Sequence, residues 1–187
     1  MIEENKKKRR SKTMWMIGLC LLLSGILWGV YSTRLRVGND RAEFEGQYRN
    51  YLVCDIPKEL DEFRSVNKNG LFMKYYMYSF VLNEESYNAY KEAVLREYSV
   101  DISNEEQLAY GYAHWYGMKV SDVNKDNPDY ILDEFPFGLP FERIIEDDIN
   151  DYSIILFSPV GTGTRQFGVL CNDAEYRIVC YYAKQRL

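Results

Sequence analysis

The chain has 187 residues, with 23 Lys plus Arg against 28 Asp plus Glu, which gives a net charge of −5. This length accommodates one domain of ordinary size besides short flanking segments. A single histidine excludes multi-histidine metal sites, and the acidic balance argues against binding to nucleic acid.

The uncharged stretch at residues 14–31 is the strongest signal in the chain. No charged residue lies between Lys12 and Arg34, and the 21 residues between them would span about 31 Å as a helix. The hydrocarbon core of a bilayer is about 30 Å thick. The sequence therefore predicts a transmembrane helix at residues 14–31.

The flanks of this stretch predict its orientation. Six Lys or Arg side chains precede it, between residues 6 and 12, whereas the nearest three that follow are Arg34, Arg36 and Arg41. Basic residues are retained on the cytoplasmic side of a membrane. We therefore expect residues 1–13 to form a basic cytoplasmic tail and the remainder of the chain to be extracytoplasmic.

A cleaved signal peptide is the main alternative, because it also begins with a basic region followed by an apolar one. The stretch is longer than the apolar region of a typical signal peptide. Its best cleavage pattern, Val30-Tyr31-Ser32, has a bulky tyrosine in the middle. The sequence therefore favours a retained signal-anchor in the cell membrane.

The extracytoplasmic part predicts a linker and one folded domain. Residues 32–47 are polar without clear periodicity, which is typical of a linker, and residues 48–187 are long enough for one core. From residue 32 onward, 17 Lys plus Arg stand against 26 Asp plus Glu, a net charge of about −9. We expect basic or neutral partners for this acidic domain.

The first half of the domain predicts an aromatic strand and three helices. Pro57 is expected to begin a short helix, and Asn69-Gly70 to form a tight turn before a strand at residues 71–82. The apolar character of that strand predicts that both of its faces are covered. Asn83 is expected to cap the next helix, and Ser103 the one after it.

The second half predicts three consecutive strands. Pro140 is expected to open a helical turn, and the strands follow at residues 152–159, 164–171 and 176–184. Because short turns join them, neighbouring strands must be antiparallel. Together with the first strand they predict an α+β fold: an antiparallel sheet of about four strands packed on two or three helices.

Three cysteines lie outside the predicted membrane helix: Cys54, Cys171 and Cys180. A turn at residues 172–175 would pair residue 171 with residue 176, which separates Cys171 from Cys180 by roughly 13 Å. That separation is too large for a disulfide between these two. We expect buried free thiols, and a bridge from Cys54 to either of the other two remains open.

Few residues suggest catalysis. His114 is expected on a helix surface, and Gly161-Thr-Gly-Thr lacks both the lysine and the following helix of a phosphate-binding loop. The crowded carboxylates at residues 146–151 could serve a membrane-tethered hydrolase as an acid/base pair, but such clusters are usually solvated loops. The sequence therefore favours a protein that is not an enzyme, with the hydrolase as an alternative.

One stretch resembles an EF-hand or dockerin calcium loop. Asp122, Asn124 and Asp126 occupy loop positions one, three and five, and Asp133 occupies position twelve. Calcium binds six to eight oxygen ligands, which this spacing can direct toward one ion. Calcium is the one cofactor suggested by the sequence, and it implies a calcium-stabilised adhesion module. An acidic loop without an ion is favoured over it.

Aromatic residues suggest a binding role. Residues 32–187 hold 16 Tyr, 9 Phe and one Trp, more than one small core can bury. Exposed tyrosines bring apolar area and a polar tip to an interface with few rotatable bonds. The candidate binding residues are Tyr75, Tyr76, Tyr78, Tyr112, Trp115 and Tyr116.

These observations combine into one functional expectation. The chain carries no Asn-x-Ser/Thr sequon, which favours a bacterial envelope over a eukaryotic secretory lumen. We expect a single-pass bacterial membrane protein whose domain binds another envelope protein, in a sensing, accessory or immunity role. Cell-wall glycan is an alternative ligand for its tyrosines.

Overall fold

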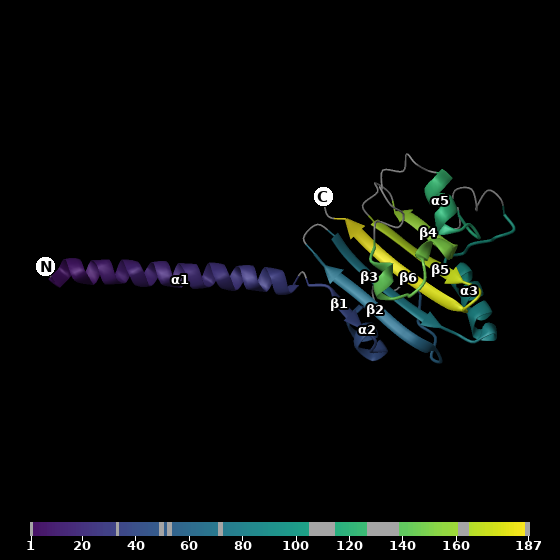
Figure 1. The fold of residues 1–187 in the computed structure, drawn as a ribbon, viewed down its shortest axis with the longest axis horizontal. Helices are drawn as coiled ribbons and strands as arrows, with labels where there is room; N and C mark the ends of the chain where they lie inside the picture. Colours follow the sequence, from purple (N-terminus) through teal and green to yellow (C-terminus); the bar gives the residue numbers. More distant parts are fainter. Residues whose placement is uncertain are drawn as a thin grey trace. The chain divides into compact units, whose positions relative to one another are not determined.

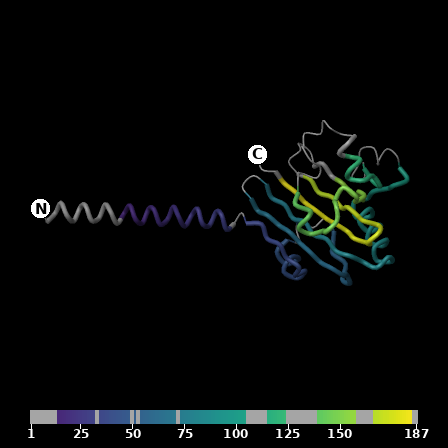
Figure 2. The backbone as a smooth tube through the Cα atoms, viewed as in Figure 1, coloured from purple at the N-terminus to yellow at the C-terminus, as the bar shows by residue number. Residues whose placement is uncertain are grey.

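The computed structural model describes residues 2–32, 34–48, 51, 54–70, 73–104, 115–126, 139–160 and 165–185. The chain divides into two units, Met1–Arg34 and Leu35–Leu187. Figures 1 and 2 show the first unit as one long helix and the second as a sheet with helices on both of its faces. We describe each unit by itself.

The first unit consists of α1 (Ile2–Ser32). Its large apolar side chains from Met14 to Tyr31 are exposed, and none of that window is buried inside the protein. Among the described residues, this is the one helix long and apolar enough to cross a membrane. An apolar surface of this extent is unfavourable in water, which agrees with the prediction of a membrane-spanning segment at residues 14–31.

The second unit is built on one antiparallel sheet. In the part of the chain that the structure describes, its six strands are β1 (Arg36–Gly38), β2 (Asp61–Asn69), β3 (Met73–Val81), β4 (Ser153–Val160), β5 (Arg165–Asn172) and β6 (Arg177–Gln185), in the order β1-β2-β3-β6-β5-β4. Every neighbouring pair is antiparallel. The α+β class is therefore confirmed, but the prediction of about four strands is wrong.

The two strands that the sequence reading missed are β1 and β2. Strand β2 has the sequence DEFRSVNKN, in which Phe63 and Val66 are the only large apolar residues and a register shift separates Asp61 from Arg64. This shift breaks the period-two pattern from which a strand is recognised. The helix expected from Pro57 does not form, because residues 54–60 lead into β2 without helical structure.

The predicted linker at residues 32–47 is also corrected. It contains β1 and most of α2 (Arg41–Tyr48), and both belong to the folded unit. Phe44 of α2 is only 2% exposed, and its ring packs against Phe63 and Tyr78. One buried aromatic side chain in an otherwise polar segment is too weak a pattern to predict this docking.

The other predicted elements agree with the structure where it describes them. Strands β4, β5 and β6 begin one residue later than expected, and α3 (Glu84–Glu97) begins after Asn83, whose side chain accepts a hydrogen bond from the Ser86 backbone. A short 3-10 helix, η2 (Phe141–Arg143), follows Pro140. Residues 105–114 of the helix expected from Ser103 lie outside the described residues.

Both faces of the sheet are covered, as predicted for the strand at residues 71–82. Helices α2 and α3 pack on one face, over Tyr78 and Phe80 of β3. Trp115, α5 (Val120–Asp126) and η2 pack on the other face, over Tyr75 and Met77. Alternation along β3 separates these two sets of side chains, so the sheet divides the interior into two cores.

Candidate functional site

Four tyrosines gather at one end of the sheet, on the face that carries α2. Tyr76 lies at the centre, with the ring of Tyr51 stacked on it at 4.4 Å between centroids and Tyr48 at 4.8 Å. Tyr182 of β6 lies 5.7 Å from Tyr51 and 6.3 Å from Tyr76. Tyr76 is buried, whereas Tyr48, Tyr51 and Tyr182 are half-buried. We call these four residues the tyrosine cluster.

Lys74 binds to this cluster. Its Nζ donates a hydrogen bond of 2.9 Å to the Tyr51 hydroxyl and lies 4.1 Å from the centroid of the Tyr51 ring. Partial burial favours a lower pKa for Lys74, but its hydrogen bonds with Tyr51 and Tyr76 outweigh burial and raise the pKa. The ammonium group therefore stays charged and gives the cluster a cationic centre among aromatic rings.

Three elements bring the cluster together. Tyr76 and Tyr182 are register partners in β3 and β6, so their side chains stand side by side on one face. Tyr48 is the last residue of α2, which the buried ring of Phe44 fixes on the sheet. Tyr51 follows three residues later, just before Cys54, whose backbone carbonyl accepts a 3.1 Å hydrogen bond from the Tyr78 hydroxyl.

The charge around the cluster is opposite to that of the whole domain. Lys68 is the residue before the last of β2, and Arg36 is the first of β1. Lys74 is the second residue of β3 and the register partner of Lys184 in β6, so all four lie at the same end of the sheet. The other end, where β2, β4 and β6 begin, carries acidic residues: Asp61, Glu62, Glu84, Glu85, Asp147, Asp148, Asp151, Asp173 and Glu175. Arg177 also begins β6 at this end and pairs with Glu62 and Glu175, but acidic groups outnumber basic ones there, so the domain is polarised along its strands.

The six predicted binding residues do not form one surface. Tyr75, Tyr76, Tyr78 and Trp115 are each 5% exposed or less. Tyr75 and Trp115 lie in the core on one face of the sheet, whereas Tyr76 and Tyr78 point to the other face. Tyr116 is half-buried, and Tyr112 lies outside the described residues. Of the predicted set, only Tyr76 belongs to the tyrosine cluster, and its binding role stays a prediction.

The binding residues predicted from the sequence did not include Tyr48, Tyr51, Lys74 or Tyr182. The alternation of side chains along a strand was the available signal. It places Tyr76 and Tyr182 on one face of the sheet, and Tyr75 and Tyr181 on the other. No local pattern could have added Tyr48 and Tyr51, since they join the cluster from another part of the chain.

The calcium prediction stays untested. Asp122, Asn124 and Asp126 lie in α5, which is helical, and Asp122 is exposed. Asp133 lies outside the described residues. Within the described ranges, no three His, Cys, Asp or Glu residues are grouped so that they could hold a metal ion.

Several candidate catalytic groups have structural partners. Glu146 accepts a 2.8 Å hydrogen bond from Arg64, and the Asp148 side chain accepts one from the Asn150 backbone. Asp147 accepts a 3.4 Å hydrogen bond from the Tyr152 hydroxyl. His114 and Gly161-Thr-Gly-Thr lie outside the described residues. These carboxylates are exposed and bind neighbours on the surface, which is the arrangement expected of a solvated loop.

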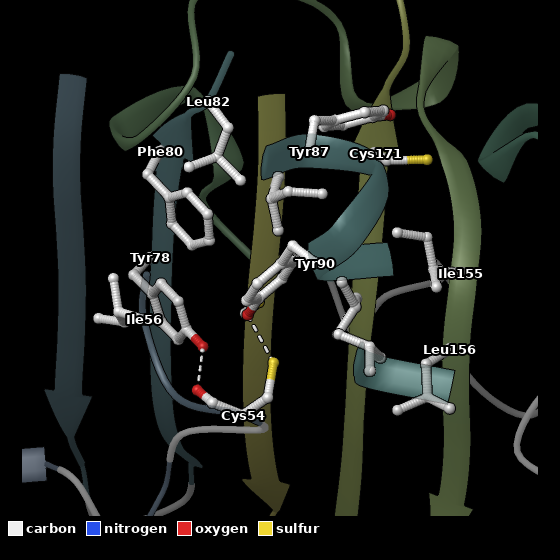
Figure 3. Close-up of a cluster of buried hydrophobic side chains, with 14 of the residues drawn as sticks. Cys54, Ile56, Tyr78, Phe80, Leu82, Tyr87, Tyr90, Ile155, Leu156 and Cys171 are labelled. Atoms are coloured by element: carbon white, nitrogen blue, oxygen red, sulfur yellow. Dashed lines mark hydrogen bonds between the residues drawn. The ribbon is translucent and has the colours of Figure 1, made fainter. Parts of the chain in front are cut away.

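A second polar group, of thiols and tyrosines, lies inside the core beneath α3 (Figure 3). The Tyr90 hydroxyl is 2.5 Å from Cys54 Sγ and 3.6 Å from Cys180 Sγ. Burial raises the pKa values of Tyr78 and Tyr90 well above the usual value for tyrosine. These groups therefore stay protonated, and they act as a hydrogen-bonded network within the core.

The chain was also compared with known proteins. No model of a protein family, no curated protein and no solved structure matches it. The tyrosine cluster is the candidate site on geometric grounds: it joins partly exposed aromatic rings, a held cation and surrounding lysines at one end of a rigid sheet.

Proposed function

We propose that this protein is a single-pass bacterial membrane protein whose extracytoplasmic domain binds another envelope protein, in a sensing, accessory or immunity role. The exposed apolar surface of α1 between Met14 and Tyr31 supports the membrane anchor. The excess of Lys and Arg before this segment supports a cytoplasmic N-terminus.

The tyrosine cluster is the observation that carries the binding role. Tyrosine is enriched at the centres of protein interfaces, because it offers a large rigid apolar area and one hydroxyl. Tyr48, Tyr51 and Tyr182 are held in place by contacts with each other and with Tyr76. Binding through preorganised rings loses little conformational entropy.

Two measurements test the anchor and its orientation. We expect the protein to stay in the membrane fraction through a carbonate wash, because a spanning helix resists alkaline extraction. We also expect protease added to intact spheroplasts to digest the C-terminal domain. Release of a shortened soluble chain would show a cleaved signal peptide, and a protected domain would show the opposite orientation.

A comparison of variants tests the binding site. The full-length protein is crosslinked in its native membrane, and the partners recovered by the wild type are compared with those of Tyr51→Ala and Tyr182→Ala. The control is Tyr176→Ala, a half-buried tyrosine in the turn at the other end of the sheet. We expect a partner that the wild type and the control recover and that both cluster variants lose at least fivefold. Equal recovery by all four proteins contradicts the site.

A further inference from the structure

Two buried thiols, Cys54 and Cys180, meet at one tyrosine hydroxyl. Tyr90 Oη lies 2.5 Å from Cys54 Sγ and 3.6 Å from Cys180 Sγ, so the two sulfur atoms are at most about 6 Å apart. Cys54 is 7% exposed and Cys180 is fully buried. Figure 3 shows the Cys54 sulfur directed toward Tyr90, in the core that α3 covers.

We propose that Cys54 and Cys180 form a disulfide bond in the mature protein, and that this bond holds the tyrosine cluster together. The inference rests on the proposed function, which places the domain in a compartment where disulfides form. Both residues are free thiols in the structure.

The strand register argues against a disulfide between Cys171 and Cys180, which lie in the same core. Cys171 of β5 is opposite Ile178 rather than Tyr176, so the predicted register was wrong, and Cys180 stands two residues farther along β6 instead of four. The ladder hydrogen bonds fix both backbones, and diagonal neighbours across an antiparallel pair are about 7–8 Å apart. A bridge between them would distort the sheet. Cys54 lies outside the strands, between α2 and β2, so no ladder hydrogen bonds fix its backbone.

The environment of Cys54 indicates when the bond forms. The Cys180 thiol and burial raise the pKa of Cys54 far above its usual value, which disfavours the reactive thiolate in the folded domain. Both sulfurs are also buried in the core that α3 covers, so an oxidant reaches them before α3 packs. The oxidant is the disulfide of a thiol oxidase of the envelope, which acts while the chain folds.

The exchange balances in two steps. The Cys54 thiolate attacks one sulfur of the oxidant's disulfide, which forms a mixed disulfide and releases one oxidant thiolate. The Cys180 thiolate then attacks the Cys54 sulfur, which forms the Cys54–Cys180 bond and releases the second oxidant thiolate. The two protons lost by the cysteines pass to the two released thiolates, so the oxidant is reduced to a dithiol.

The bond would act directly on the proposed binding site. Tyr51 stands three residues before Cys54, and Tyr182 stands two residues after Cys180 on the same strand. A covalent link between the cysteines holds the segment that carries Tyr51 against β6, which carries Tyr182. We expect the oxidised protein to keep Tyr51 stacked on Tyr76 and the reduced protein to lose this order more readily.

Thiol counting on the full-length protein tests the bond. Cells are lysed in a thiol-blocking reagent, and the denatured protein is analysed by mass spectrometry before and after reduction. Two of the four cysteines, Cys20 and Cys171, are expected to be blocked at lysis, and the other two only after reduction. The Cys171→Ser control keeps the bond, and Cys54→Ser leaves Cys180 free. A bond that maps to Cys171 overturns the proposal.

A second measurement separates the pairing from the location. The purified protein is reduced, unfolded in detergent and returned to native conditions in a glutathione redox buffer, where the Cys54–Cys180 bond is expected to form. Free thiols in this buffer overturn the pairing. A bond formed here, together with four free thiols in cells, supports the pairing and overturns the extracytoplasmic location on which the proposed function depends.

Discussion

At the level of single residues, Gly168 shows how closely the core that contains Tyr75 and Tyr181 is packed. A Cβ atom there would lie 2.7 Å from the Tyr181 ring and 2.8 Å from the Leu156 backbone oxygen. Tyr181 is fully buried and the oxygen belongs to a strand, so neither can move away without cost. We expect Gly168→Ala to lower the free energy of unfolding by about 1–3 kcal/mol, measured by denaturant titration.

Gly46 provides the matched control. It lies within α2, and a Cβ atom there would meet nothing within 4 Å. Alanine is favoured over glycine inside a helix by about 0.5–1 kcal/mol, so Gly46→Ala should stabilise the domain slightly. If both variants unfold at the wild-type denaturant concentration, the packing around Gly168 is looser than described.

Asp173 links the stability of the domain to pH. Hydrogen bonds of 2.5 Å from the Tyr87 hydroxyl and 3.0 Å from Lys91 Nζ lower the pKa of its carboxyl group. A lowered folded-state pKa means that the contribution is present above the unfolded value, about 3.9, and is lost as the pH falls through the folded value.

The predicted contribution of Asp173 to stability is small, and it is fully present only above about pH 4. We expect Asp173→Asn to lower the free energy of unfolding at pH 7 by less than about 1 kcal/mol, because the group is largely exposed. Thermal unfolding of both proteins between pH 2 and pH 7 provides the measurement. The difference should shrink as the pH falls, and a difference that grows in acid contradicts the assignment.

At the level of elements, the first turn of α3 depends on its cap. The Asn83 side chain accepts a 2.8 Å hydrogen bond from the Ser86 backbone, and Glu84 and Glu85 follow at the positive end of the helix dipole. We expect Asn83→Ala to lower the free energy of unfolding by about 1 kcal/mol. Asn83→Asp, which can still accept the bond, should stay close to the wild type in the same denaturant titration.

The predicted membrane helix gives a second prediction at this level. Leu22 lies near the middle of residues 14–31, and its side chain is exposed. A lysine at the centre of a spanning helix costs about 3 kcal/mol of insertion free energy. We expect Leu22→Lys to reduce the fraction that stays in the membrane after a carbonate wash, whereas Leu22→Val should not. An unchanged fraction for the lysine variant contradicts insertion at this residue.

At the level of the whole molecule, charge polarity gives the binding proposal a salt dependence. The cluster end carries Lys68, Lys74 and Lys184, although the domain as a whole is acidic. Raising ionic strength from about 0.1 M to about 1 M shortens the Debye length from about 10 Å to about 3 Å. We expect partner recovery to fall several-fold over this range.

Charge reversal tests whether partner binding depends on the charge beside the tyrosine cluster or on the net charge of the domain. Lys184→Glu should weaken recovery of the partner several-fold, because Lys184 stands on the same face as Tyr182. Lys58→Glu, which changes an exposed residue just before β2, should leave recovery unchanged. If both reversals raise recovery equally, the net negative charge of the domain governs binding, and the partner is basic.

The sequence determined the elements whose patterns are local. Uncharged residues 14–31 define an apolar helix because hydropathy depends on composition alone. Strands β4 to β6 and the start of α3 were predictable because alternation, short turns and a capping asparagine act between near neighbours.

Only the tertiary structure decided the edge of the sheet and the candidate site. Strand β1 has three residues and pairs with β2 through long-range contacts, so its own sequence carries little signal. The tyrosine cluster joins α2, β3 and β6, and the close thiols Cys54 and Cys180 are distant along the chain. Such contacts depend on how strands pair and which face each side chain meets, and local patterns do not fix that choice.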